Sequence, residues 1–190
     1  MLKKSGALLG GLLDAAMIAV ISANRGELVM VLVLECIVIC FILFVPCVVV
    51  IANGVHNGAF LFEKDVQERV VEMGLVTKEQ LSRNKKLFKI ISLTVMISFV
   101  IWAVYGINGA RGFLNPFLQI YALAMAEGLF DRFFIDTFWV GHTKAWTIPG
   151  TEDLKPYIPK KTLIAKWLIV IVGSSAIAAA LAGIMMLFFK

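Results

Sequence analysis

Four acidic residues lie inside apolar stretches of this sequence that are long enough to cross a lipid bilayer. They are Asp14, Glu35, Glu127 and Asp131. An acidic side chain at the centre of a membrane helix costs about 3 kcal/mol on insertion scales, unless it is paired, protonated or hydrated. Four such residues therefore predict a polar interior, of the kind that holds substrates, ions or protons in membrane proteins.

Glu127 and Asp131 are the most informative pair, because they are four residues apart and share one helical face. Glu127 follows Pro116 by roughly 16 Å of helix, which places it near the middle of the bilayer. Two like charges at this spacing repel each other unless one is protonated, or a cation or basic group lies between them. The sequence leaves a structural and a functional role for this pair equally open.

Asp14 and Glu35 extend the acidic series toward the N-terminus. Asp14 is at the middle of its stretch, and the small residues Gly10 and Gly11 beside it favour close packing against another helix. Glu35 is about two turns from the outer end of its stretch, so it either snorkels outward or faces the interior. If all four acids face inward, they form a series from the outer third of the membrane to the inner third.

Arg132 and Asp136 form another pair with i,i+4 spacing, and the simplest interpretation is an ion pair that ends the helix at the membrane surface. His56, His142 and Lys144 are expected at that same surface. With the neighbouring acids, the histidines would offer nitrogen and oxygen ligands to a metal. No metal-binding spacing such as HExxH or CxxC is present, so we predict no metal site.

The elements that carry these residues predict an all-α polytopic membrane protein, in which 60% of the residues are hydrophobic. About 20 apolar residues suffice for one span. Five expected spans run over about 5–23, 28–52, 87–105, 116–140 and 162–189. The first resembles a signal peptide in its flanks, but Asp14 in its apolar centre favours a span. For the fourth, we expect Asn115 as the N-cap and Pro116 as the first helical residue.

The distribution of basic residues predicts the orientation. Most Lys and Arg residues fall at the N-terminus, in a segment of about 53–86 and in a polar loop of about 141–161. Basic residues favour the cytoplasmic side, which places the N-terminus inside and the C-terminus outside. An aromatic belt is expected at the inner interface, formed by Trp139, Trp146, Tyr157 and Trp167. We therefore expect a single multi-pass membrane domain, in the plasma membrane, whose cytoplasmic face attracts anionic lipid headgroups.

The longer cytoplasmic segment is expected to fold as a short helical hairpin. Val66, Val70 and Met73 share one helical face, and Gly74 suits the C-terminal cap. Thr77 and Gln80 then have the spacing of a capping box for a helix that continues into the third span. This hairpin serves either as a solvated linker or as a docking surface for a partner.

Several patterns limit the chemistry of this chain. Cys36, Cys40 and Cys47 lie on one helical face without partner cysteines on another span, so we interpret them as packing residues. No phosphate loop, dinucleotide fingerprint or nucleophile elbow is present, so the sequence argues against an ATP-driven activity within this chain and leaves the cofactor unknown. The basic residues form no recognisable nucleic-acid-binding module.

The last span predicts contacts on two sides, because small residues repeat every four positions on two of its faces. These ridges are Ser174/Ala178/Ala182 and Ser175/Ala179/Gly183. One of them is expected to serve a homodimer or another membrane subunit.

Passage of a small solute or cation is the function ranked first, with Asp14, Glu127 and Asp131 as the conducting acids. The alternative is a membrane-embedded enzyme acting on a lipid-linked or amphiphilic substrate at the cytoplasmic face. A third possibility is an accessory subunit. Charged groups that open on both sides of the membrane favour passage, whereas convergence at one face favours chemistry.

If Glu127 and Asp131 are functional, Glu127→Gln and Asp131→Asn each abolish activity and leave the protein folded, because removing one of two repelling acids relieves strain. Thermal stability and activity of both variants in liposomes test this. Full activity in both variants would make the pair structural.

Overall fold

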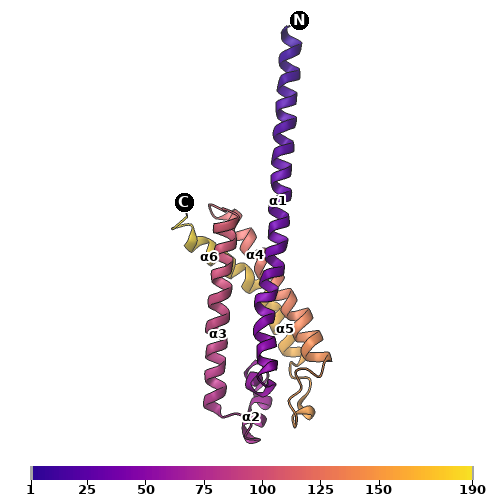
Figure 1. Ribbon diagram of the computed structural model, residues 1–190, viewed down its shortest axis with the longest axis vertical. Coiled ribbons are helices and arrows are strands. Elements are labelled where there is room, and N and C mark those ends of the chain that lie inside the picture. The colour runs from indigo at the N-terminus through magenta and orange to yellow at the C-terminus, as the bar shows by residue number, and fades with distance from the viewer. Residues whose placement is uncertain (1, 190) are drawn as a thin grey trace. The chain divides into compact units, whose positions relative to one another are not determined.

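The computed structural model describes the backbone of residues 2–189 and the side chains of residues 26–189. Every regular element in this part of the chain is a helix (Figure 1). The chain divides into two units, residues 1–35 and residues 36–190. The first unit is the N-terminal part of helix α1 (Leu2–Ala52), and the second contains the rest of α1 and all the later elements.

The later elements include α-helices, short 3-10 turns and wider π-helical segments. In chain order they are η1 (Val55–Leu61), α2 (Lys64–Glu72), α3 (Lys78–Ile101), η2 (Trp102–Ile107), α4 (Leu114–Phe130), η3 (Asp131–Val140), η4 (Glu152–Leu154), α5 (Lys160–Leu168), η5 (Ile169–Gly173) and α6 (Ser174–Met185).

Helix α1 differs from the expected pair of antiparallel spans, because it continues without a break through residues 24–27. The sequence offers only Gly26 as a helix breaker at this point, and one glycine costs about 1 kcal/mol relative to alanine. That cost is too small to force a turn. The first expected span and Asp14 have no described side chains, so the position of Asp14 lies outside the described residues.

Three helices are long and apolar enough to cross a membrane within the described part of the chain. They are Gly26–Ala52, Lys78–Ile107 and Lys160–Met185, which contain the second, third and fifth expected spans. The fourth expected span is helical over α4 and η3, but polar side chains interrupt its apolar character. The finding supports a membrane protein with three such helices.

The start of α4 corrects one expectation. The helix begins at Leu114, and Phe113 is the cap residue, so Asn115 is not an N-cap. Pro116 is still within the first turn, where its missing N–H leaves no hydrogen bond unmade. The side chain of Asn115 instead accepts a hydrogen bond from Gln119 at 2.8 Å, and Gln119 accepts one from Asn108 at 2.9 Å.

Within the second unit, α4 packs against α6 and η5. Gly128 allows this approach, because a Cβ atom at this position would lie 2.6 Å from the side chain of Val170. One of the two small-residue ridges of α6 is buried, namely Ser174, Ala178 and Ala182. That ridge therefore serves packing within the chain.

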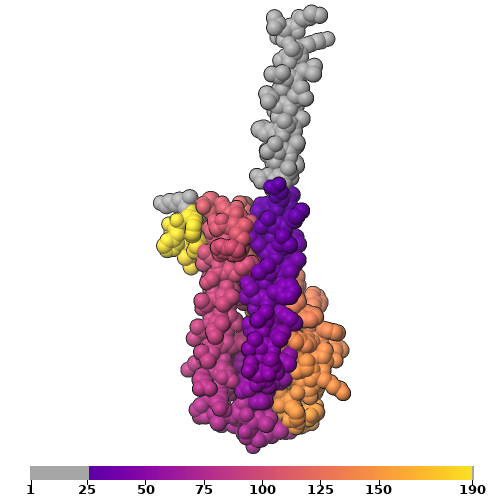
Figure 2. Space-filling view, in the orientation of Figure 1, coloured from indigo at the N-terminus to yellow at the C-terminus, as the bar shows by residue number. Residues whose placement is uncertain are grey.

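The segments 53–86 and 141–161 lie together at one end of the second unit (Figures 1 and 2). Their shared core includes Val66 and Val70 of α2, as expected, whereas Met73 is exposed. The capping box is confirmed. The backbone N–H of Gln80 donates to the Thr77 hydroxyl at 3.1 Å, and the backbone N–H of Thr77 donates to the side-chain oxygen of Gln80 at 2.9 Å. An ordered hairpin therefore precedes α3.

Candidate functional site

Arg132 is the centre of a charged network on the π-helical segment η3. Its guanidinium donates hydrogen bonds to the carboxylates of Asp131 and Asp136. Arg132 and Asp136 are each only 8% exposed. Such burial is tolerable for an ionised group only when opposite charges and hydrogen bonds compensate it, and the two acids provide both for Arg132.

Lys166 of α5 completes this network from another part of the chain. Its ammonium group lies 3.1 Å from a carboxylate oxygen of Asp136. The four side chains carry two negative and two positive charges, so the network is neutral overall. Because Asp136 contacts both bases, it couples η3 to α5.

The charged network forms part of the wall of a cavity of about 260 Å³ in the second unit. The rest of the wall is mostly apolar. It is formed by Leu43, Cys47, Leu61, Phe62, Phe88, Ile135, Val140, Trp146 and Ile158. The volume is slightly below the usual range of roughly 300–1,000 Å³ for small-molecule sites, so the cavity fits a small polar head rather than a whole amphiphile.

Two buried N–H donors of this wall have no hydrogen-bond partner among the described residues. They are Nε of Arg132 and Nε1 of Trp146. A buried donor without a partner costs about 1–3 kcal/mol, more when the group is charged. Both residues belong to the cavity wall. A small rotation of either side chain toward an oxygen acceptor in the cavity would therefore relieve this cost.

Trp146 lies in the loop 141–161, and packing and hydrogen bonds around it hold it in place. The Phe62 ring packs edge-on against Trp146, with centroids 6.0 Å apart, and also contacts Tyr157 at 4.8 Å. The Tyr157 hydroxyl accepts a hydrogen bond from the Ile148 amide at 3.1 Å and pairs with the Thr151 hydroxyl at 2.6 Å. Trp146 and Tyr157 are therefore buried core residues, which corrects their assignment to an interfacial aromatic belt.

The structure brings three of the expected site residues together, namely Asp131, Arg132 and Asp136. Glu127 is half-buried on α4, one turn away, and is not part of the cavity wall. It forms no ion pair with any described residue. Glu35 is the last residue of the first unit, and its side chain is buried.

The other expected residues lie outside the cavity wall. The exposed His142 has its Nδ1 atom 2.7 Å from the carbonyl oxygen of Thr137, and Lys144 is also exposed. His56 contacts the side chain of its neighbour Asn57 at 3.3 Å. Among the described residues, no group of three or more His, Cys, Asp or Glu side chains is placed to hold a metal ion.

Two of the cysteines contact α4. The thiols of Cys36 and Cys40 point to the carbonyl oxygens of Ala122 and Ala126, at 4.0 and 3.7 Å. Cys40 follows Cys36 by one helical turn, and Ala126 follows Ala122 by one turn, so the same contact repeats along the interface between α1 and α4.

Lys166 and Trp146 are the residues that sequence reasoning missed. A signal for Lys166 exists, since a lysine four residues inside an expected span needs a partner as much as an acid does. Trp146 carries no comparable signal, because its place in the wall depends on the fold of the loop.

No protein family, no curated protein and no solved structure matches this chain. The geometry of the cavity is therefore the basis for a functional proposal.

Asp136→Asn should destabilise the protein by about 3–5 kcal/mol, because it removes a carboxylate shared by two bases, one of them buried. Lys166→Met should cost less, since its side chain is 30% exposed. Unfolding in detergent measures both effects. Asp153→Asn is the control, because it breaks an exposed pair with Arg69 that is worth at most about 1 kcal/mol. An equally mild effect of Asp136→Asn would contradict the role of this network.

Proposed function

We propose that this chain is a multi-pass membrane protein that binds an amphiphilic molecule with its polar head in the charged cavity. The observation that supports this most is the convergence of two acids and two bases in an otherwise apolar cavity. An apolar wall suits hydrocarbon next to the head, and the fixed charges suit the head itself.

The activity that we favour is enzymatic: the protein would act chemically on the polar head of the bound amphiphile. Arg132 and Asp136 are the most buried members of the network and position the others. Asp131 and Lys166 have side chains that are 22% and 30% exposed, so they are the groups able to reach a bound head. A carboxylate and an ammonium in this arrangement provide a general base and a general acid.

Passage of a small solute or cation is the function that the sequence ranked first. This geometry gives less support to the passage of a cation. Asp131 and Asp136 are already neutralised by Arg132 and Lys166. A cation in the cavity would therefore have to displace a base that is fixed to the protein.

For the orientation, we propose that the segments 53–86 and 141–161 face the cytoplasm and that the C-terminus faces outward. The positive residues of these segments support this arrangement. The cytoplasmic N-terminus required a turn before residue 28, and α1 is continuous there, so it is not part of this proposal. The span at 5–23 remains a prediction. The second ridge of α6, Ser175/Ala179/Gly183, remains the expected surface for a second copy or another subunit.

This orientation predicts that a reporter fused after the last residue is active outside the cytoplasm, and that one inserted at Gly74 is active inside. Gly74 is an exposed turn position, so an insertion there should leave the core intact. Reporter activity in intact cells measures both. The opposite pattern would show that the topology is inverted. Activity of both reporters on the same side would show that one of the proposed crossings between them is absent.

The binding proposal predicts that Trp146→Phe weakens retention of the co-purified amphiphile by roughly 2- to 10-fold, because the substitution deletes a donor to its head. Thermal stability should fall moderately, because the smaller ring leaves a void in the buried core, whereas no hydrogen bond to a described residue is lost. Mass spectrometry of the purified protein measures the bound amphiphile.

Trp139→Phe is the matched control, because Trp139 packs edge-on against Trp146 at 5.4 Å but does not line the cavity. Equal losses in both variants would show a general packing effect. Unchanged retention in Trp146→Phe would exclude this donor from the site.

A further inference from the structure

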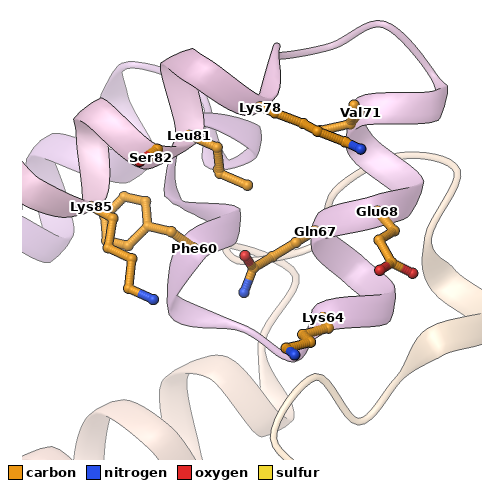
Figure 3. A pocket seen from close by; sticks show the side chains of 9 residues that line it. All are labelled: Phe60, Lys64, Gln67, Glu68, Val71, Lys78, Leu81, Ser82 and Lys85. Carbon is orange, nitrogen blue, oxygen red and sulfur yellow. The ribbon is translucent and has the colours of Figure 1, made fainter.

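A second pocket, of about 410 Å³, lies on the outside of the hairpin between η1, α2 and the start of α3 (Figure 3). It shares no lining residue with the charged cavity. Its basic side chains are Lys64, Lys78 and Lys85, and its one acid is Glu68. The pocket is therefore cationic, whereas the cavity is neutral.

The three lysines are available to a ligand. All three are exposed, and none forms an ion pair with a described residue. Figure 3 shows Lys64 and Lys85 on either side of the Gln67 side chain, with Glu68 on the far side of Gln67 from Lys85. The Gln67 side chain is itself oriented by a 2.8 Å hydrogen bond to the carbonyl oxygen of Phe62.

The floor of the pocket is apolar, because Phe60 and Leu81 are buried beneath the lysines. Phe60 packs against Phe88 of α3, with ring centroids 5.5 Å apart. Since η1 and α3 are in contact, the floor belongs to the ordered core and fixes the part of α3 that carries Lys78 and Lys85.

The pocket lies at the membrane end of a spanning helix. Lys85 precedes Ile90 by five residues, about 7.5 Å along α3. Ile90 and Ile91 are exposed apolar residues within the candidate span Lys78–Ile107. The headgroup layer on each side of a bilayer is about 5–7 Å thick, so Lys85 lies at its outer edge when the hydrocarbon begins at Ile90.

The adjacent face of α3 has the same sign of charge. A shallow pocket there contains Arg83 and Lys86 together with Lys78 and one acid, Glu79. Both faces of the first turns of α3 thus present positive charge where the helix enters the membrane.

We propose that the pocket of Lys64, Lys78 and Lys85 binds the phosphate headgroup of an anionic membrane lipid. The three ammonium groups form no ion pair with a described residue, so their charge is free to attract a phosphate. The depth of Lys85 places the pocket beside lipid headgroups, and the acyl chains continue along the exposed apolar surface of α3. This site is independent of the amphiphile proposed for the cavity.

The test uses the full chain purified in detergent and titrated with short-chain phosphatidylglycerol, with bound lipid counted by native mass spectrometry. Lys64→Gln together with Lys85→Gln should weaken phosphatidylglycerol binding by roughly 30-fold, and each single variant by about fivefold. Lys160→Gln together with Lys161→Gln is the matched control, because it removes the same charge from exposed residues outside the pocket.

Three further outcomes decide the proposal. Equal losses in the pocket and control variants would show general charge attraction and overturn the site. Equal binding of zwitterionic phosphatidylcholine would also overturn it. Glycerol phosphate that binds as tightly as the lipid would assign the pocket to a soluble ligand instead. Melting temperatures of all variants distinguish a lost site from a lost fold.

Discussion

The candidate site depends on one constraint, which is that a buried guanidinium cannot give up its charge. Arginine keeps its proton at any pH that a protein survives, so burial of Arg132 requires fixed negative partners. Asp131 and Asp136 meet this need, but they leave one negative charge over. Lys166 balances it through Asp136, which ties α5 to η3. The position of one side chain thus determines how two helical segments meet.

The same charge balance bears on the three functions that the sequence left open, and most directly on the passage of a cation. The acids were recognised by their depth in apolar stretches, and depth alone suggests a path across the membrane. Pairing changes this interpretation, because an acid that holds a base of the same protein has little affinity left for a passing cation. The relevant quantity is the net charge of the cluster, and it becomes visible only when Lys166 is placed beside Asp136.

Local signals predicted local structure well. The capping box at Thr77 and the glycine cap at Gly74 need only a few consecutive residues, and both are present in the fold. The contribution of Trp146 to the cavity depends on its contact with the distant Phe62, which also packs against Tyr157, and no short pattern encodes these contacts. The break expected before residue 28 failed for a related reason: charge and hydropathy suggested a turn, but the helix propensity at Gly26 was not low enough to produce one.

The two pockets select for different ligands, because their charges differ. The cavity combines balanced charges with two unpartnered donors, so it favours a head that offers oxygen acceptors without much net charge. A strongly anionic head would meet Asp131 and Asp136 as well as the bases. The hairpin pocket has three lysines and one acid, so it favours an anion and discriminates against a neutral head. If both proposals hold, one end of the protein binds an anionic lipid on its surface and a less charged amphiphile inside, without competition between them.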